Sequence, residues 1–407
     1  MKTLLKNTGL TLGSLVFSLL LAELALWLVG FPPITAFLER IAHPPNSSEY
    51  REHIEFEYLF KTNSHGLKYP ELPLERPDGE SRILVLGDSF VEGYGLSVED
   101  SFPPRVEENF QNARFLNAGL AGVGPAQYAR LLHHKGLDLN LTGVLLAVTY
   151  NDPGDTPPDM DLERIYDKTF VKEVQIFGAT YSVALLEFIP RLSGLLFQIS
   201  EIRRRSSLYE NFLEETITVA KQQGASDEKI RQWISGLDPK LVEASRTNRF
   251  NAAIITTGLL IPEYLKESID VHNDVANRKF ERMLMILDEI VKIAGTRDLP
   301  VALVFIPSYY HYYDYAHGDD NPWKASGMII ERKWLTERTE IQRRLGQWAQ
   351  RSNVPYLDLT NSFRDQSTRD DGLNFPLDCH WTPDGAAFAG KVTADWLKQE
   401  RIFDLRD

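Results

Sequence analysis

The sequence predicts an α/β fold in which a parallel sheet of five strands is covered by helices on both faces. Short apolar runs, each long enough for a buried strand, alternate with longer segments of helical character. Continuous apolar runs are typical of strands buried on both faces, as in parallel sheets. With 407 residues, 43% of them hydrophobic, the chain can form a large core, either as one α/β domain with an insertion or as two domains.

Five segments have the composition of such strands. The most regular are 82–86, 144–148 and 301–306, in which nearly every residue is apolar. A short strand ending at 115–116 and a last one at 354–358 complete the predicted sheet. Helices are expected at about 102–111, 126–136, 273–296, 333–351 and 383–398.

The first 31 residues predict a membrane anchor. Lys2 and Lys6 precede an apolar stretch at 9–31 whose one charged residue is Glu23. A helix of this length, at about 1.5 Å per residue, would span a bilayer core. The lysines predict a cytoplasmic N-terminus, with the remainder of the chain periplasmic or extracellular. A cleaved signal peptide is the alternative, but this stretch ends in bulky residues and lacks an Ala-x-Ala site.

The positions of the prolines and of the predicted strands divide the rest of the chain into segments. Residues 32–80 contain many prolines and are expected to form a connector with limited regular structure. Residues 81–155 and 298–407 carry the strands of the α/β domain. The segment 156–297 is too long for an ordinary crossover and has apolar residues at helical spacing, for example within 188–196. It is expected to be a helical insertion or cap.

Composition excludes several classes of function. A net charge of −13 argues against a general nucleic-acid binder, which must neutralise phosphates. The single cysteine, Cys379, permits neither an intramolecular disulfide nor a cysteine-based metal cluster. The chain also lacks a His-Glu-x-x-His pair and a phosphate-binding Gly-Lys-Ser/Thr loop. Neither a metal nor another cofactor is therefore expected.

The first chemical motif follows the first predicted strand. Gly87-Asp88-Ser89-Phe90 places a serine at the carboxyl end of a strand, where open α/β sheets form their active sites. Gly87 permits a sharp turn, and a helix that begins here would direct N–H groups toward a developing oxyanion. Val91 replaces the last glycine of the Gly-x-Ser-x-Gly elbow. A serine that merely caps a helix is the alternative interpretation.

The second motif is an Asp-x-His near the C-terminus. Residues two apart in extended backbone point the same way, so Asp378 is expected to contact and orient the imidazole of His380. His380 would then accept the proton of the Ser89 hydroxyl, which is too weak a nucleophile alone. Thr382 and Pro383 suit the N-cap and first position of the final helix, which would fix this loop. A surface Asp–His pair beside a helix start is the alternative.

Two further loops after predicted strands contain suitable hydrogen-bond donors. Gly119 follows the second strand, and Asn151 follows the third. A tetrahedral intermediate needs two or three N–H donors at its oxygen. The backbone N–H groups of Ser89 and Gly119 and the side-chain amide of Asn151 are the candidate oxyanion hole.

A tyrosine-rich segment follows the fourth strand, at the same predicted edge of the sheet. Tyr309, Tyr310 and Tyr312 are candidate substrate-binding residues there, because aromatic faces stack on sugar rings. A packed loop with its hydroxyl groups hydrogen-bonded is the alternative.

In these four segments the chain resembles the SGNH hydrolases, the GDSL-type esterase and lipase superfamily. That family is named for Ser, Gly, Asn and His in this order, which match Ser89, Gly119, Asn151 and His380. The resemblance covers about 81–155 and 299–400 and implies a flavodoxin-like three-layer sandwich around a five-stranded parallel sheet. It also implies an acyl-enzyme on the serine and activities that include esterase, lipase, thioesterase and acetyl transfer.

Two departures from the family pattern bear on the substrate. Many members place two residues between the last Asp and His, whereas here one residue separates Asp378 from His380. This spacing is similar to that of SGNH-like proteins that handle O-acetyl groups of polysaccharides, some of them membrane-anchored. The insertion at 156–297 also exceeds the compact family core.

The expected function is therefore serine-dependent acyl transfer on an ester, with acylated cell-envelope carbohydrate as the expected substrate. Water as acceptor would make the protein an esterase, and a sugar hydroxyl would make it an O-acetyltransferase. A non-catalytic glycan-binding or assembly subunit with the same fold is the alternative. An intact set of Ser89, Asp378 and His380 counts against that alternative.

Overall fold

The structure, a computed structural model, describes most of the chain beyond residue 41. The described residues are 42–166 without residue 74, then 173–176, 179–182, 211–367 and 372–405, and a few separate residues before 42. The chain forms two compact units: Met1–Arg40 with Asp167–Ser207, and Ile41–Tyr166 with Leu208–Asp407. All predicted site residues belong to the second, larger unit.

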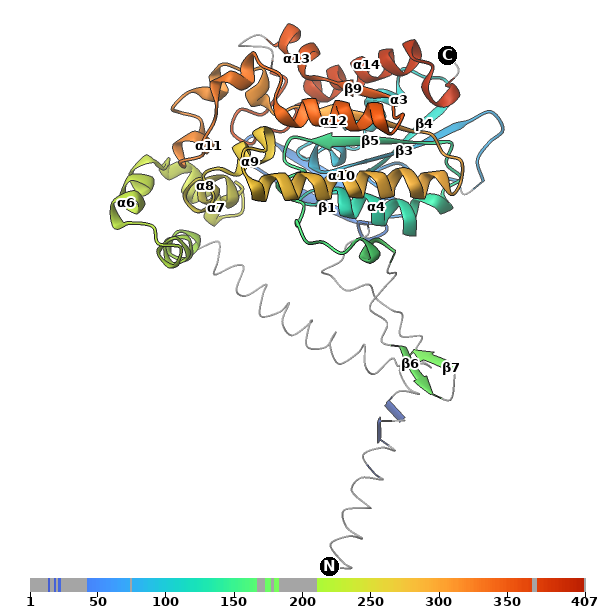
Figure 1. Ribbon diagram of the computed structural model, residues 1–407, viewed down its shortest axis with the longest axis horizontal. Helices are drawn as coiled ribbons and strands as arrows, with labels where there is room; N and C mark the ends of the chain where they lie inside the picture. The colour runs from blue at the N-terminus through green and yellow to red at the C-terminus, as the bar shows by residue number, and fades with distance from the viewer. Residues whose placement is uncertain are drawn as a thin grey trace, which may run out of the picture. The chain divides into compact units, whose positions relative to one another are not determined.

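A five-stranded parallel sheet forms the centre of the larger unit (Figure 1). Its strands lie in the order β4-β3-β5-β8-β9, which is the strand order of flavodoxin-like sheets. The strands are β3 (Ser81–Gly87), β4 (Ala113–Gly119), β5 (Gly143–Thr149), β8 (Val301–Ile306) and β9 (Tyr356–Asp358). The prediction of an α/β fold with a five-stranded parallel sheet is confirmed. The predicted strand at 301–306 has the same bounds as β8.

The register brings the carboxyl ends of the central strands to one edge of the sheet. Gly87 pairs with Gly119 at the ends of β3 and β4, and Thr149 pairs with Ile306 at the ends of β5 and β8. The loops that follow these strands therefore meet along this edge, as in other open α/β sheets.

Helices cover both faces of the sheet, because right-handed crossovers change face where the strand order reverses (Figure 1). One layer contains α4 (Pro125–His134), α10 (Asp274–Gly295) and α12 (Glu340–Arg351), and the other contains α3 (Phe102–Glu107) and α14 (Pro383–Gln399). Within the first layer, Trp348 Nε1 of α12 donates to Asp288 of α10 at 2.8 Å.

Capping residues set the starts of two of these helices. Thr382 caps α14 by accepting the N–H of Gly385, and Pro383 occupies its first turn, as predicted. At α12, Thr339 and Gln342 form a capping box, so the helix begins at Glu340 rather than at 333. The shorter helices are α2 (Ser89–Glu92), α11 (Pro322–Ala325), α13 (Thr360–Gln366), and the 3₁₀ turns η1 (Gly136–Asp138), η2 (Leu162–Ile165), η3 (Tyr309–His311), η4 (Tyr315–His317), η5 (Arg332–Leu335) and η6 (Ile402–Asp404).

The predicted connector contains more regular structure than expected. Strands β1 (Ser48–Glu52) and β2 (Glu57–Lys61) pair as an antiparallel hairpin, and the side chains of Tyr58 and Phe60 are buried. Lys68 is also fully buried, where its ammonium donates to the carbonyls of Gly93 and Leu96 at 2.8 and 2.7 Å. The described part of the connector is therefore packed against the α/β domain, although it contains many prolines.

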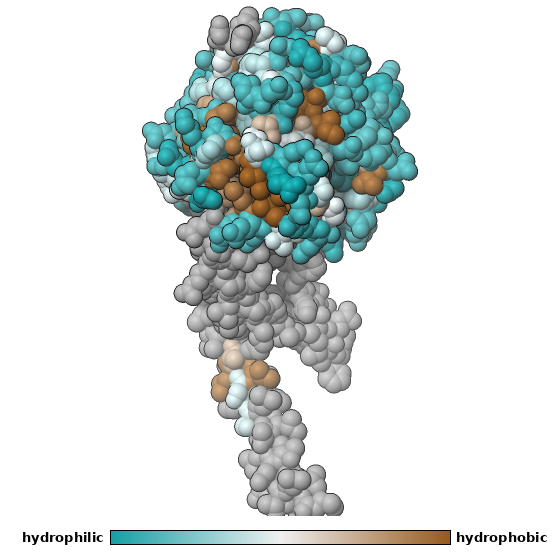
Figure 2. All heavy atoms as spheres, turned by 90° about the vertical axis from the view of Figure 1, so that its left-hand side faces the viewer, coloured by the Kyte–Doolittle hydropathy of each residue, from teal (hydrophilic) through white to brown (hydrophobic). Residues whose placement is uncertain are grey.

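Part of the predicted insertion forms a helical region with its own small core. Its helices are α6 (Asp227–Gly236), α7 (Pro239–Arg246), α8 (Ala252–Leu260) and α9 (Tyr264–Asp270). Trp233, Phe250 and Ile254 are among the buried residues of this second core. Figure 2 views this end of the larger unit, where apolar side chains are exposed in patches among polar ones. By contrast, α10 was expected in the insertion but packs into the main core through residues such as Phe280.

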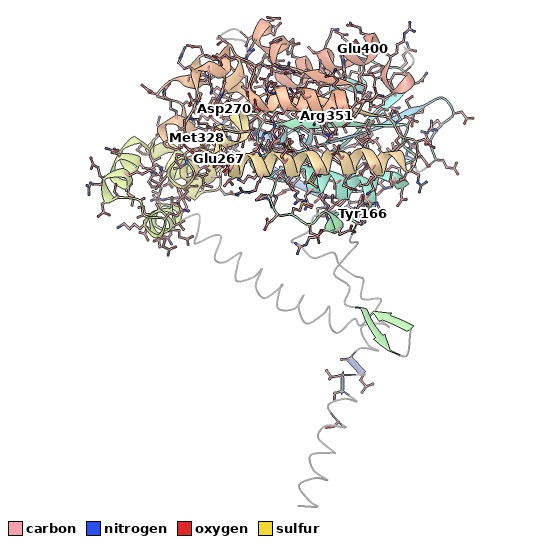
Figure 3. The ribbon with its side chains drawn as sticks, in the orientation of Figure 1. Tyr166, Glu267, Asp270, Met328, Arg351 and Glu400 are labelled. Atoms are coloured by element: carbon pink, nitrogen blue, oxygen red, sulfur yellow. The ribbon has the colours of Figure 1, made fainter. Side chains whose placement is uncertain are left out.

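Helix α9 joins the helical region to the α/β domain. Figure 3 labels its residues Glu267 and Asp270. Asp270 accepts the indole N–H of Trp334 at 3.0 Å and lies 2.9 Å from the ammonium of Lys333. These polar contacts attach the end of α9 to the turn η5.

The described part of the smaller unit includes a short antiparallel hairpin. Strand β6 (Glu173–Ile176) pairs with β7 (Ala179–Ser182), so that Glu173 faces Ser182 in the register. The predicted helical stretch at 188–196 and most of the predicted anchor at 9–31 lie outside the described residues. Among the residues that are described, no helix combines the length and the apolar character needed to cross a bilayer.

Candidate active site

Ser89 lies where β3 ends and α2 begins. The cap of α2 is Asp88, whose Oδ1 accepts the backbone N–H of Phe90 at 2.9 Å. Its Oδ2 accepts the hydroxyl of Thr149 at 2.8 Å, and burial raises the pKa of Asp88 to about 6. Because Asp88 takes the capping position, Ser89 does not fill the role that the alternative interpretation gave it.

The imidazole of His380 lies between Ser89 and Asp378. Its Nε2 is 2.7 Å from Oγ of Ser89, and its Nδ1 is 2.5 Å from Oδ1 of Asp378. With the Nδ1 hydrogen donated to Asp378, Nε2 presents its lone pair to the serine hydroxyl. The structure thus brings together three side chains that the sequence separates by up to 291 positions.

Burial and ion pairing set the charges of these groups. Burial alone would lower the pKa of His380, but the charge of Asp378 and their hydrogen bond raise it above its ordinary value of 6.5. Burial alone would raise the pKa of Asp378, but the attraction of His380 lowers it. Asp378 therefore remains ionised, and His380 is a stronger base than free imidazole. A base of this strength is suited to abstracting a proton near neutral pH.

The loop between Asp378 and His380 is a tight turn and not the extended backbone that was expected. Cys379 has φ +77°, in the left-handed region that non-glycine residues seldom adopt. The Asp–His contact depends on this turn. The expected contact between Asp378 and His380 is present, but the reason given for it from extended geometry was wrong.

Neighbouring residues hold this turn in place. Asn374 donates its side-chain amide to the carbonyl of Cys379 at 2.7 Å, and its Oδ1 accepts the hydroxyl of Tyr312 at 2.7 Å. The backbone N–H of Phe375 donates to the carbonyl of His380 at 2.8 Å. A left-handed residue persists only where its surroundings impose it, and these hydrogen bonds supply that constraint.

The three predicted oxyanion donors differ in their environment. Ser89 is the first residue of α2, so its backbone N–H has no carbonyl within the helix to accept it. Asn151 donates one amide hydrogen to Asp155 at 2.9 Å, and an amide nitrogen carries a second. The N–H of Gly119, however, donates to Oδ1 of Asn117 at 3.0 Å. The N–H of Gly119 is therefore already hydrogen-bonded within its own loop, whereas the sequence predicted that it would donate to an oxyanion.

Close packing explains the glycine at 119. A Cβ there would lie 2.0 Å from the backbone nitrogen of Glu92 and 2.5 Å from the carbonyl carbon of Val91. In the same loop, Gly122 is exposed, has φ +74°, and has no atom within 4 Å of a Cβ position. Close packing therefore requires a glycine at 119, whereas the positive φ is what favours a glycine at 122.

We expect Gly119→Ala to lower the free energy of unfolding by about 1–3 kcal/mol, because the added methyl group must displace backbone atoms of α2. Denaturant unfolding measures the effect. Gly295→Ala is the matched control, since a Cβ at this end of α10 meets nothing within 4 Å. Equal stability of the two variants would contradict the packing explanation.

The tyrosines proposed to bind substrate are buried. Tyr309 and Tyr310 are 0% and 1% exposed, and Tyr312 is 7% exposed. The hydroxyl of Tyr309 accepts the amide of Asn321 at 2.6 Å, and Tyr312 supports the Asp–His turn through Asn374. The prediction of a sugar-stacking surface at these residues is wrong, because their rings pack in the core. The alternative interpretation, a packed loop with bonded hydroxyl groups, describes Tyr309 and Tyr312.

Other residues at the site were not anticipated. The half-buried rings of Phe56, Tyr94 and Phe375 cluster together, and Tyr94 lies 5.2 Å from the ring of His380. Glu55 contacts the backbone of the loop that carries Asp378. No local sequence signal marks these residues. Glu55, for example, is 323 positions away from Asp378, whose N–H it accepts.

The described residues contain no group of three or more His, Cys, Asp or Glu side chains arranged to hold a metal ion. Around the hydroxyl of Ser89 lie the imidazole of His380, the carboxylate of Asp378 behind it, and the N–H groups at the start of α2. Such a set can activate a hydroxyl nucleophile and transfer its proton.

Comparisons with known proteins give likenesses of fold. No protein-family model matches the chain, and no curated protein does. The similar solved structures include a GDSL-like lipase from Bacteroides thetaiotaomicron (TM-score 0.35, 8% identity, covering 80% of this chain and 92% of that one). They also include a lipase/acylhydrolase from Enterococcus faecalis (TM-score 0.34, 11% identity, 79% and 96%) and a member of the lipolytic G-D-S-L family from Veillonella parvula (TM-score 0.33, 9% identity, 78% and 99%). We base the functional proposal on the geometry of the site.

Proposed function

We propose that the protein is a serine esterase of the SGNH type, in which Ser89 is the nucleophile, His380 the general base and Asp378 the residue that orients it. One observation carries this proposal: Oγ of Ser89, the two ring nitrogens of His380 and Oδ1 of Asp378 form a continuous row with contacts of 2.7 and 2.5 Å. A neutral imidazole held in one tautomer between a serine and a carboxylate is the arrangement that activates serine in hydrolases on unrelated folds.

The chemistry proceeds in two steps. Nε2 of His380 takes the hydroxyl proton of Ser89 while Oγ attacks the ester carbonyl, and the carbonyl electron pair moves onto oxygen. The tetrahedral intermediate collapses, the C–O bond to the alcohol breaks, and His380 returns the proton to the leaving alkoxide. Water, deprotonated by His380, then attacks the acyl carbonyl; the C–Oγ bond breaks, His380 returns the proton to Oγ of Ser89, and the acid is released.

The oxyanion needs N–H donors beside Ser89. The N–H of Ser89 at the start of α2 and the second amide hydrogen of Asn151 remain the proposed donors. The N–H of Gly119 is already donated to Asn117 and is not proposed as a donor.

The cellular setting and the substrate are a further part of the proposal. Lysines before the apolar stretch at 9–31 support an anchor with a cytoplasmic N-terminus and a periplasmic or extracellular enzyme domain. The single residue between Asp378 and His380 supports O-acyl groups of cell-envelope glycans as the substrate, with transfer to a sugar hydroxyl as the variant reaction. A non-catalytic glycan-binding subunit is the competing proposal. It gives no reason for the hydrogen-bonded row at Ser89.

The test combines a covalent probe with turnover. A serine-directed fluorophosphonate is expected to label the wild-type protein at Ser89 and to block hydrolysis of p-nitrophenyl acetate, whereas Ser89→Ala is expected to lose both. Ser235→Ala is the control, because that exposed serine contacts only the carbonyl of Gln232 in α6. Labelling and turnover that persist in Ser89→Ala would contradict the proposal and favour the binding subunit.

A second assay separates hydrolysis from transfer. With p-nitrophenyl acetate and a glycan acceptor present together, an esterase releases acetate alone, whereas a transferase also forms acetylated sugar. Mass spectrometry of the glycan distinguishes the two outcomes.

A further inference from the structure

The turn between β1 and β2 contacts the loop that carries Asp378. The carboxylate of Glu55 accepts two adjacent backbone N–H groups, that of Leu377 at 2.9 Å and that of Asp378 at 2.7 Å, one at each oxygen. A carboxylate that accepts two backbone N–H groups fixes the backbone more firmly than a neutral acceptor does. The backbone position of Asp378 is thus set by a residue more than 300 positions earlier in the chain.

A second residue of the same turn faces the side chain of Asp378. His53 is buried, and its Nε2 lies 3.8 Å from Oδ2 of Asp378, the oxygen that does not contact His380. Its ring stacks on Phe56 at 4.4 Å and lies 5.4 Å from Phe250 of the helical region. Asp378 is therefore placed between two imidazole rings.

The same N-terminal segment also holds the helix that carries Ser89. Glu92, the last residue of α2, is fully buried, and its carboxylate lies 2.9 Å from Nε2 of His43 and 3.3 Å from Nη1 of Arg51. It also accepts the backbone N–H of Ala121 at 2.7 Å. Arg51 in β1 thus contacts the helix that begins with Ser89, and Glu55 in the following turn contacts the loop that carries Asp378.

The helical region also contacts this turn. The N–H of Ile54 donates to the carbonyl of Arg249 at 2.9 Å, and Ile54 packs against the second hydrophobic core. Leu377, next to Asp378, packs against the same core. The turn therefore contacts both the helical region and the loop that carries Asp378.

We propose that the β1–β2 hairpin, residues 48–61, is a positioning element of the active site, and that Glu55 is the positioning residue that holds Asp378 in reach of His380. This inference rests on the proposed function. The hairpin contacts both the nucleophile helix, through Arg51, and the Asp378 loop, through Glu55. It therefore fixes how the two halves of the site meet. Glu55 itself touches no reacting atom and acts through the backbone of Asp378.

The test replaces Glu55 with glutamine, which keeps the shape but exchanges one acceptor oxygen for an NH₂ group that faces a backbone N–H. The kcat of Glu55→Gln for p-nitrophenyl acetate is expected to fall about 10- to 100-fold, because a small displacement of Asp378 misplaces the base. KM is expected to stay within about twofold, since Glu55 does not contact substrate. Glu57→Gln, at an exposed position in β2, is the matched control and is expected to retain wild-type kcat.

A second readout does not depend on turnover. In an NMR titration of the His380 ring, the raised pKa of the wild-type imidazole is expected to move toward 6.5 in Glu55→Gln, because the contact with Asp378 loosens. Should the wild-type protein prove inactive toward esters, this titration still tests the positioning role, so the two proposals fail separately. Glu55→Asp retains both acceptor oxygens and is expected to restore part of the kcat and of the pKa. If Glu55→Gln does not fold, the comparison of Glu55→Asp with wild type carries the same test.

A folded Glu55→Gln variant with wild-type kcat and an unchanged His380 pKa would overturn the proposal. Equal losses in Glu55→Gln and Glu57→Gln would overturn the specific role given to Glu55, because the loss would then not come from its contact with the Asp378 backbone. Thermal unfolding of each variant shows which proteins are folded at the assay temperature.

Discussion

His380→Ala is expected to lower kcat for ester hydrolysis by about 10⁶-fold, because the imidazole is the group within hydrogen-bond distance of the Ser89 hydroxyl. Without it, the hydroxyl keeps its proton at neutral pH and is a weak nucleophile. The residual rate then comes from substrate binding and from the oxyanion donors. Steady-state kinetics with p-nitrophenyl acetate measure the loss, and the fluorophosphonate is expected to stop labelling Ser89.

The matched control is His272→Ala, at a partly exposed histidine that pairs with Glu263 outside the site. Its kcat is expected to equal that of the wild type. If His380→Ala lost no more activity than His272→Ala, another group would have to act as the base. The hydrogen bonds that join Ser89, His380 and Asp378 would then not serve catalysis.

Asp378→Asn is expected to lower kcat by about 10⁴-fold while leaving the fold intact. An asparagine at this position keeps the shape of the side chain but can present an NH₂ group to Nδ1 of His380. The ring then favours the tautomer whose Nε2 carries the hydrogen, and it cannot accept the proton of Ser89.

The pH profile gives this variant a distinctive signature. Wild-type kcat/KM is expected to be lost as pH falls through the pKa of His380, which lies above 6.5, because the imidazolium cannot accept a proton. Removing the charge of Asp378 leaves burial as the main influence, and burial lowers the pKa of His380. The midpoint of the acid limb should therefore move to lower pH in Asp378→Asn.

Asp384→Asn, an exposed change at the start of α14, should leave the midpoint in place. An unmoved midpoint in Asp378→Asn would show that Asp378 does not control His380.

The sheet was predictable because its central strands consist of continuous apolar runs in the sequence. The residues 301–306 are all buried in β8, and burial on both faces is what removes polar residues from such a strand. The start of α14 was predictable for a different reason: Thr382 and Pro383 are local signals that need no tertiary contact. Ser89, Asp378 and His380 could be found because each lies beside such a local signal.

The remaining details depend on contacts between distant segments. The left-handed turn at Cys379 is imposed by Asn374 and Tyr312, and no pattern within the Asp-x-His motif indicates it. Gly119 was expected to donate to an oxyanion, but a glycine required by close packing and one open to a ligand look alike in a sequence. The tyrosines after β8 likewise contact distant residues, Tyr309 the cap of α11 at Asn321 and Tyr312 the ring of Phe363 in α13, whose positions the sequence alone did not give.

The packed hairpin has a practical consequence for preparing the protein without its predicted anchor. A version cut just before β3, at about residue 81, would retain Ser89, Asp378 and His380 but would leave Glu92 without His43 and Arg51. A buried carboxylate tolerates the loss of the Arg51 guanidinium and of its contact with His43 poorly. A secreted or affinity-tagged version should therefore start no later than residue 42, so that it includes His43 and the β1–β2 hairpin.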